Sequence, residues 1–301
     1  MKVQDGSRRV RITRPGIFAG LPEDRYHADP VPETSLSYSG AKLLLDCPAR
    51  FQHERQHPRS TSTFDEGRAA HAKVLGVGEP TIAVPAELLS SDGGIRSNDA
   101  KAWVAEHKTA GYTVLKPDVV DRIDAMAEQL RQHPIAAKLL RDGEPERSLF
   151  DRDPETSIML RCRLDWTTRL RSGRPCIVDY KTSTTADPDR FGKTANDFNY
   201  VMQDRWYPEL ADRLTGESHA FLFIVQEKTA PYLVSVCELD AESRAVGAQR
   251  NRDARRLYLD CMTSGLWPGY EARVHRVSLP PYVLRDAPID IDEIPTEGEA
   301  A

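Results

Sequence analysis

The sequence predicts an α/β fold of the α+β kind, in which a mixed central β-sheet is flanked by helices. Two observations predict it. Ile158–Thr182 alternates apolar and polar residues on both sides of a polar turn, which is typical of a β-hairpin. Residues 117–132 and 199–214 carry apolar residues at helical spacing. We expect a single domain over residues 1–285, with a mainly helical accessory region at 77–145 and an acidic, disordered tail at 286–301.

The hairpin brings acidic and basic side chains to one face. If Leu170 pairs with Arg174 across a three-residue turn, Asp165 falls opposite Asp179, on the face that also carries Lys181. Opposed Cβ atoms lie roughly 4.5–5.5 Å apart, so two carboxylates there can hold one divalent cation. Hard oxygen ligands suit Mg²⁺ or Mn²⁺. The alternative is a solvated face with a ladder of charges, because Asp-x-Lys alone is a frequent pattern.

The composition restricts how the protein can bind its partners. The net charge is −5, so any contact with DNA must be local rather than spread over a basic surface. The sequence has no run of eighteen apolar residues and no signal peptide, which predicts a soluble intracellular protein that does not enter a membrane. The five cysteines are scattered and odd in number, which favours reduced thiols over disulfides.

The N-terminal third predicts a short strand followed by helices. Residues 1–32 are rich in turn residues, with one short strand. Ser39 is the expected N-cap of the next helix, which Pro48 interrupts or restarts. Phe64–Gly76 predicts a helix that places Gly67 and His71 on one face. A lone helical histidine is more often a packed or surface residue than a ligand.

The rest of the chain alternates helices and strands. In the accessory region we expect a helix capped by Asn98 or Asp99, a second over 117–132 and a third near 135–140. A short strand at 148–151 precedes the hairpin, and the polar residues 182–198 predict a loop. The remaining predicted elements are a helix at 199–214, strands at 220–225 and 232–239, and a helix at 241–264. The helix at 199–214 places Gln203 and Tyr207 on one face.

Four segments stand in an order that resembles a known nuclease group. Gly-Arg-Ala-Ala-His (67–71), the lone Asp165, Asp-Tyr-Lys (179–181) and Gln203-x-x-x-Tyr207 are similar to the motifs of the RecB-like PD-(D/E)XK nucleases. Within that group, "YHADP" and "SLSYSGAKLLLDCPARF" resemble the RecE/exonuclease VIII family of phage recombination exonucleases. The resemblance runs from about Phe18 to Trp267 and implies a restriction-endonuclease-like core.

The resemblance also implies roles for individual residues. His71, Asp165, Asp179 and the Tyr180 carbonyl would ligate Mg²⁺, with Mn²⁺ as a substitute, and a second ion would share Asp165 or Asp179. Lys181 would orient or deprotonate the attacking water. Gln203 and Tyr207 would pack beside the site. Iron–sulfur members of the group need three cysteines clustered near the carboxyl end, and only Cys237 and Cys261 lie there, so we expect no such cluster.

By resemblance, the expected function is processive 5′-to-3′ digestion of one strand of linear double-stranded DNA. The resulting 3′ overhangs would pass to a RecT-type single-strand annealing protein during recombination. The family implies a ring-like homo-oligomer, such as a tetramer, encoded by a phage or prophage and acting in the cytoplasm of a bacterial host. The alternatives are a RecB-like nuclease of other polarity, an endonuclease, or a non-catalytic DNA-binding relative.

Overall fold

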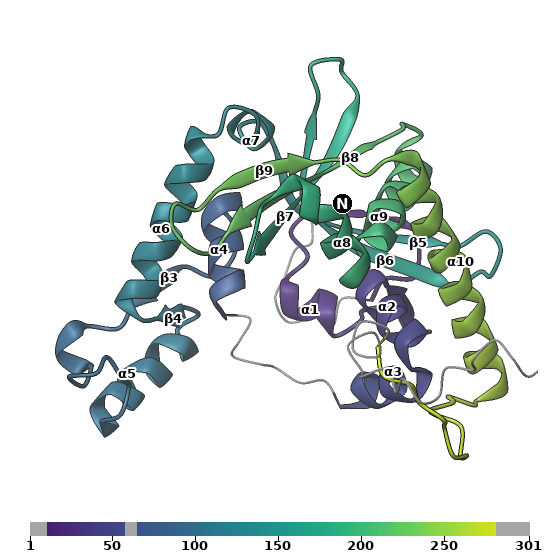
Figure 1. The fold of residues 1–301 in the computed structure, drawn as a ribbon, viewed down its shortest axis with the longest axis horizontal. Coiled ribbons are helices and arrows are strands. Elements are labelled where there is room, and N and C mark those ends of the chain that lie inside the picture. The colour runs from purple at the N-terminus through teal and green to yellow at the C-terminus, as the bar shows by residue number, and fades with distance from the viewer. Residues whose placement is uncertain (1–10, 58–64, 281–301) are drawn as a thin grey trace, which may run out of the picture.

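The computed structural model describes residues 11–57 and 65–280, and its centre is a seven-stranded mixed sheet (Figure 1). Five of its strands follow the order β1-β5-β6-β7-β8 and a sixth, β9, forms the edge, while β2 pairs separately with β6. The strands of this sheet are β1 (Gly16–Phe18), β2 (Ser35–Ser37), β5 (Gly143–Arg152), β6 (Met159–Arg169), β7 (Pro175–Ser183), β8 (Ala220–Glu227) and β9 (Val234–Cys237).

Helices lie on both sides of this sheet, as the sequence predicts (Figure 1). They are α1 (Glu23–His27), α2 (Tyr38–Asp46), α3 (Pro48–Gln56), α4 (Asp65–Leu75), α5 (Asn98–Thr109), α6 (Pro117–Gln132), α7 (Ala136–Leu139), α8 (Pro188–Asp197), α9 (Tyr200–Thr215) and α10 (Ala241–Ser264). A short 3₁₀-helix covers Ala86–Leu88. Within the described ranges, no helix combines the length and the apolar character needed to cross a membrane.

The described part of the sheet has a large buried core on each face, and a smaller core surrounds Phe18, Phe150 and Met159. The first packs α2, α9 and α10 against the strands, through side chains that include Leu44, Trp206 and Tyr258. The second packs α4, α6 and α7 against them, through Ala70, Ile123 and Leu139 among others. Figure 1 shows α4 and α6 on one side and α9 and α10 on the other. Burial of apolar area on both faces stabilises the sheet by roughly 25 cal/mol for each Å² removed from water.

The β6–β7 hairpin has the predicted register. Trp166 pairs with Val178 and Arg169 with Pro175, and the Leu170 N–H donates to the Arg174 carbonyl across the turn. The same register, continued by one residue, sets Asp165 against Asp179.

Two helices begin one or two residues away from the predicted caps. The N-cap of α2 is Ser37 rather than Ser39, and the N-cap of α5 is Ser97 rather than Asn98 or Asp99. Both serines have extended backbone, and each hydroxyl accepts the N–H of the residue three positions later. An N-cap needs this non-helical backbone, so the first polar residue with that geometry becomes the cap.

The prediction of a loop over 182–198 is wrong, because α8 occupies Pro188–Asp197. The Asp187 side chain accepts the Asp189 N–H, and Pro188 stands in the first turn, where its missing N–H costs nothing. Only Phe191 and Ala195 of this helix are buried, so the apolar signal in the sequence is weak.

Other elements differ in length or were missed. Strand β5 covers ten residues rather than the predicted four at 148–151. The accessory region contains a two-stranded parallel sheet, β3 (Thr81–Ala83) with β4 (Thr113–Leu115), beside its helices. Each strand is only three residues long, too short to show alternation. The predicted acidic tail lies outside the described residues.

Candidate active site

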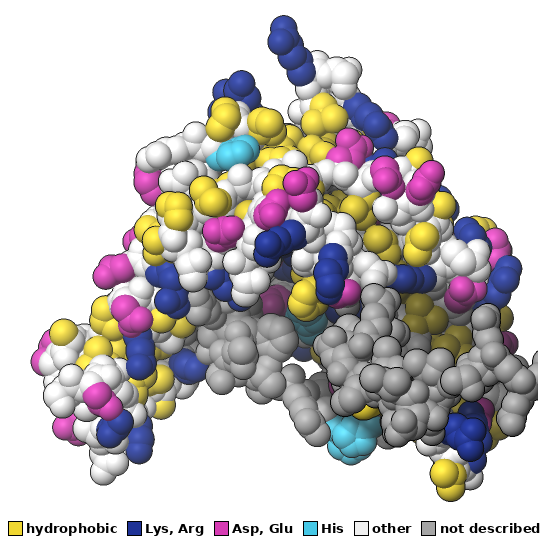
Figure 2. Space-filling model, viewed as in Figure 1, with side chains coloured by type: hydrophobic (Ala, Val, Ile, Leu, Met, Phe, Trp, Pro, Cys, Tyr) yellow, Lys and Arg dark blue, Asp and Glu magenta, His cyan; other side chains and the backbone are white. Residues whose placement is uncertain are grey.

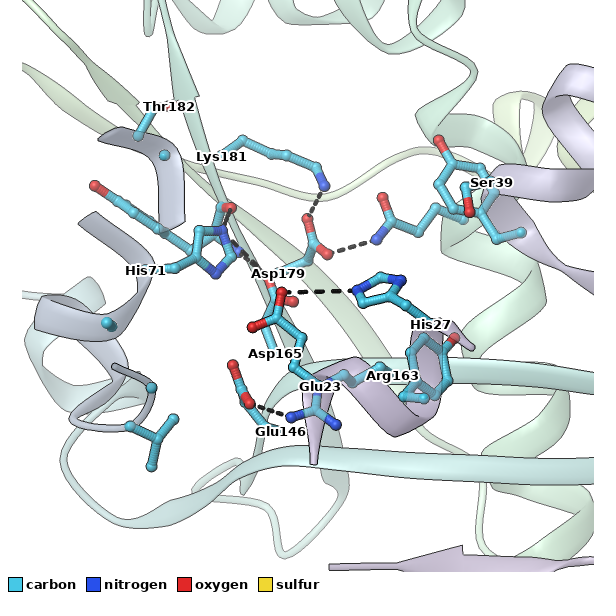
Figure 3. A pocket seen from close by; sticks show the side chains of 18 of the residues that line it. Glu23, His27, Ser39, His71, Glu146, Arg163, Asp165, Asp179, Lys181 and Thr182 are labelled. Atoms are coloured by element: carbon cyan, nitrogen blue, oxygen red, sulfur yellow. Dashed lines mark hydrogen bonds and ion pairs between the residues drawn. The ribbon is translucent and has the colours of Figure 1, made fainter. Parts of the chain in front are cut away.

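A cleft of about 490 Å³ opens where the pairing between β6 and β7 stops (Figure 3). The residues that the sequence singles out come from α4, β6, β7 and α9, and all of them line this cleft: His71, Asp165, Asp179, Tyr180, Lys181, Gln203 and Tyr207. Segments more than 130 positions apart in the sequence therefore meet at one place.

The carboxylate of Asp165 replaces a backbone carbonyl as hydrogen-bond acceptor where the β6–β7 ladder ends. The described β6–β7 pairs stop at Trp166 and Val178. Two residues further along β7, the Tyr180 N–H donates to Asp165 Oδ2 at 3.1 Å. In a regular antiparallel ladder this N–H would meet a backbone carbonyl. The side chain of Asp165 is thus held in place by the backbone of the neighbouring strand.

His71 reaches the same point from α4. Its Nε2 lies 2.8 Å from the Tyr180 carbonyl oxygen and 3.8 Å from Asp165 Oδ2. Because a carbonyl only accepts hydrogen bonds, Nε2 carries the proton in this arrangement. The imidazole also tilts against the Tyr180 ring, with 5.3 Å between the centroids.

Asp179 is 1% exposed and lies between two donors. Gln203 Nε2 donates to its Oδ1 at 2.5 Å, and Lys181 Nζ lies 2.6 Å from its Oδ2 (Figure 3). Burial raises the pKa of Asp179 to about 6, the charge of Asp165 adds to this increase, and the Lys181 ammonium opposes it.

Lys181 is an ammonium ion enclosed by negative groups. Burial acts to lower its pKa, but the charges of Asp179 and Asp165 outweigh burial and raise the pKa above the usual lysine value. Its Nζ also lies 4.7 Å from the centroid of the Tyr200 ring, within the range of a cation–π interaction. In this arrangement Lys181 is a charged donor rather than a base.

The donor set fits a hard divalent cation. Two carboxylates, a carbonyl and an imidazole converge, and Asp179 Oδ2 and Gln203 Oε1 are buried without a well-directed hydrogen bond. However, His71 Nε2 is bonded to the Tyr180 carbonyl, and among the described residues no three His, Cys, Asp or Glu side chains are close enough to hold an ion. Binding a cation would therefore require the His71 ring and the Lys181 ammonium to withdraw from their present partners.

The cleft also contains side chains that the sequence did not single out. The ion pair of Glu146 with Arg163 is one of them (Figure 3). Glu146 has φ 47°, and Glu146 and Asp165 are the two opposed residues that the β5–β6 pairing skips, so the register is unchanged on either side of them. Arg163 also donates to the Leu21 carbonyl at 2.7 Å. Period-two alternation from Asp165 would have found Arg163, whereas the left-handed backbone at Glu146 has no sequence signal.

Helix α1 lines the cleft with Tyr26 and with Glu23 and His27, which are four positions apart. Their side chains lie 3.7 Å from each other (Figure 3). The sequence predicts an irregular segment here, and a five-residue helix is too short for its periodicity to show.

Helix α10 fixes the turn of α9 that carries Gln203. Asn251 Nδ2 donates to the Met202 carbonyl at 3.0 Å, and Arg244 Nε lies 3.1 Å from Asp204 Oδ1. Between these contacts, Gly247 lets the two backbones touch, because a Cβ there would lie 1.9 Å from the Val201 carbonyl oxygen. One helical turn further, Tyr207 forms part of the cleft wall and meets Tyr38 edge to face.

The fold and the grouping of Asp165, Asp179 and Lys181 at the end of a hairpin define a PD-(D/E)XK-type protein. The sequence matches the model of a family described as "PDDEXK-like domain of unknown function (DUF3799)" over residues 37–276, and the chain belongs to this family.

One solved structure supports the fold. A crystal structure of a "putative exonuclease" from Eubacterium rectale is similar, with a TM-score of 0.54 and 11% identity, over 89% of this chain and 98% of that chain. A second structure, of a protein called SSO0001, has a TM-score of 0.27 and 15% identity over 67% of this chain and 85% of that one, too low to support an argument. No curated protein matches the sequence. The family is PDDEXK-like, and the first structure shares the fold of this chain.

Proposed function

We propose that this protein is a Mg²⁺-dependent 5′-to-3′ exonuclease of double-stranded DNA, which leaves 3′ single-stranded overhangs for recombination by strand annealing. The observation that carries the proposal is the convergence of Asp165, Asp179 and Lys181 beside His71 and the Tyr180 carbonyl. The direction of digestion and the recombination role rest on the resemblance to the RecE/exonuclease VIII family.

In this proposal His71, Asp165, Asp179 and the Tyr180 carbonyl would hold the cation. When bound, it would supply Lewis-acid activation and make water a stronger nucleophile. Lys181 would orient the attacking water and stabilise the negative charge that develops on the scissile phosphate. Gln203 would keep the Asp179 carboxylate in place through the hydrogen bond to Oδ1.

The proposed partners are open ends of double-stranded DNA and a RecT-type annealing protein, with a ring-like homo-oligomer such as a tetramer as the assembly. We also propose action in the cytoplasm of a bacterial host and a phage or prophage origin. Figure 2 shows Lys and Arg side chains interspersed with Asp and Glu on the visible face. This mixed surface, together with the net charge of −5, supports DNA binding at a limited surface such as the lining of a ring.

The test is digestion of a linear duplex labelled separately at each 5′ and 3′ end, with a covalently closed circle beside it. Early release of the 5′ label, and no cleavage of the circle, is the expected result in Mg²⁺. Early release of the 3′ label would favour the other polarity, and cutting of the circle an endonuclease. A lack of cleavage in both Mg²⁺ and Mn²⁺ would leave the non-catalytic DNA-binding relative.

The same assay tests the site. Asp179→Asn keeps the size of the side chain but removes a carboxylate that the chemistry requires, so activity should fall at least 100-fold while the circular dichroism spectrum is unchanged. Asp124→Asn is the matched control, because Asp124 also faces a lysine, with 2.8 Å to Lys73 Nζ, but lies outside the cleft. Near-normal activity of Asp179→Asn would exclude this site assignment.

A further inference from the structure

An exposed aromatic ring stacks on a tyrosine that lines the cleft. Phe198 occupies the junction between α8 and α9, and 55% of its surface is exposed. Its ring stacks on that of Tyr200, with 5.6 Å between the centroids and 18° between the planes. The outer face of the Phe198 ring is therefore open to solvent while the inner face is covered.

Tyr200 connects this ring to the cleft. Tyr200 lines the cleft, and Lys181 Nζ lies 4.7 Å from its centroid. These two steps place the Phe198 ring within about 10 Å of the Lys181 ammonium. Phe191 and Phe223 pack around the same tyrosine from the protein interior, so Phe198 is the solvent-facing member of an aromatic cluster.

The backbone under Phe198 is held rigidly. Asn199 has φ 59°, a left-handed conformation that fixes the turn into α9. The Tyr38 hydroxyl lies 3.2 Å from the Phe198 carbonyl and 3.3 Å from the Asn199 carbonyl, and can donate to either. Arg250 donates to the side-chain oxygens of Asn199 and Asn196, at 2.7 and 2.9 Å. The ring is thus ordered before any partner arrives, which lowers the entropy lost on binding.

We propose that Phe198 stacks on a nucleobase of the strand bound in the cleft, a few nucleotides from the scissile phosphate. The inference rests on the proposed function, because it takes DNA as the substrate. Every base offers a π face, so stacking would hold the strand without reading its sequence. Lys181 would contact phosphate while Phe198 covers a base, and the two contacts together would fix the strand in register with the reacting atoms.

The test compares wild type, Phe198→Ala and Phe198→Trp on duplexes that carry one abasic analogue at successive positions from the end. Stacking on an aromatic side chain is worth about 1–3 kcal/mol per base, which corresponds to a roughly 5- to 150-fold change. Phe198→Ala should lower kcat/KM on intact DNA by this factor, and Phe198→Trp should retain most of the wild-type kcat/KM. An abasic analogue at the position that Phe198 covers should lower the kcat/KM of the wild type by the same factor. It should not lower the kcat/KM of Phe198→Ala any further.

Ile135→Ala is the matched control, because Ile135 is also 55% exposed but lies next to α7, outside the cleft. It should leave every rate unchanged. If Phe198→Ala loses the same factor on every abasic substrate, the ring only supports Tyr200 and the stacking proposal is overturned. Wild-type rates for Phe198→Ala would overturn it as well.

The stacking and the proposed function can fail separately. If the wild type cuts no DNA, the proposed function fails, and binding titrations with the same labelled duplexes decide the stacking. Affinity that falls 5- to 150-fold in Phe198→Ala, and equally with one abasic position, would support stacking. Equal affinity of both proteins for all the duplexes would refute it.

Discussion

On β7, just beyond the last residue paired with β6, Asp179 is buried and Lys181 is half-buried, and each stabilises the charged form of the other. The negative charge of Asp179 is destabilised by burial, and the neighbouring Asp165 carboxylate raises the pKa of Asp179 further. Gln203 contributes a neutral donor that stabilises the Asp179 charge without adding another. Its other side-chain atom, Oε1, is buried without a hydrogen bond. We infer that Gln203 is a positioning residue for the carboxylate.

Gln203→Leu should therefore lower kcat/KM by roughly 10- to 150-fold, because a hydrogen bond to a charged group is worth about 1.5–3 kcal/mol. Cleavage of the linear duplex measures the effect. Gln132→Leu is the control, since Gln132 Nε2 also donates to a carboxylate, that of Glu128 at 2.9 Å, but on the exposed face of α6. Equal activity of the two variants would show that the Gln203 hydrogen bond does not position the site.

Asp204, next to Gln203 but facing α10, should make stability depend on pH. Burial raises its pKa to about 6, although Arg244 and Arg205 act in the opposite direction. Between about pH 4 and 6 the folded protein therefore keeps a proton that the unfolded chain releases, so this group's contribution to stability falls as pH rises through that window. Asp204→Asn removes the titration.

Urea unfolding of both proteins at pH 4 and pH 7 measures this dependence. Going from pH 4 to pH 7, the wild type should lose about 2–3 kcal/mol of unfolding free energy relative to Asp204→Asn, since one pKa unit corresponds to about 1.4 kcal/mol. Other carboxylates titrate in both proteins and cancel in the difference. A difference that stays constant with pH would contradict the raised pKa of Asp204.

At the scale of elements, the contact between α9 and α10 determines where Gln203 lies. The two helices touch through backbone at Gly247, and Asn251 and Arg244 bond to α9 on either side. The position of one face of the active cleft is thus set by a helix that contributes no side chain to the cleft lining.

Gly247→Ala should destabilise the protein by about 3 kcal/mol, because a Cβ would clash with the Val201 carbonyl and force the helices apart. It should also lower activity by moving Gln203. Gly192→Ala is the control: Gly192 is an exposed residue of α8 whose added Cβ would meet nothing within 4 Å. That change should stabilise by about 0.5–1 kcal/mol. Thermal unfolding measures both, and equal melting temperatures would contradict this account of the contact.

The individual elements also show which features of the fold and the site could be predicted from the sequence. The hairpin register follows from alternation and turn length, so the opposition of Asp165 and Asp179 was predictable. Long amphipathic elements such as α6 have the predicted bounds, Pro117–Gln132. Helix α8 was not predictable because it buries only two apolar residues, and the place of Glu146 was not because its left-handed backbone has no sequence pattern. Local patterns encode local pairings, whereas these features depend on tertiary contacts.

At the scale of the whole molecule, the accessory region at 77–145 packs against the helix that carries His71. His71 stands on α4, and the neighbouring residues Ala69 and Ala70 lie in the same core as Ile123 and Leu130 of α6. This core also contains Tyr180, whose carbonyl His71 contacts. A shared core of this kind supports our proposal that residues 1–285 form one domain. The packing of α4 and α6 in one core with Tyr180 could not be predicted from the sequence, because these segments share no common sequence pattern.

The pairing of the first two strands has a consequence for how the chain folds. Gly16 pairs with Phe150 and Ser35 with Met159, whereas β6 and β7 are joined by a short turn. Contacts between distant segments require closure of long loops and form slowly. During synthesis, β1 and β2 must wait without partners until β5 and β6 have left the ribosome, so the cleft wall that Glu23, Ser37 and Ser39 supply cannot be in place before β5 and β6 are made. In pulsed hydrogen exchange, the β6–β7 amides should be protected before those of β1 and β2. The reverse order would disprove this order of strand formation. A nascent chain would then carry the hairpin with Asp165 and Asp179 well before it has a finished cleft, and the proposed activity would arrive only once the cleft is complete.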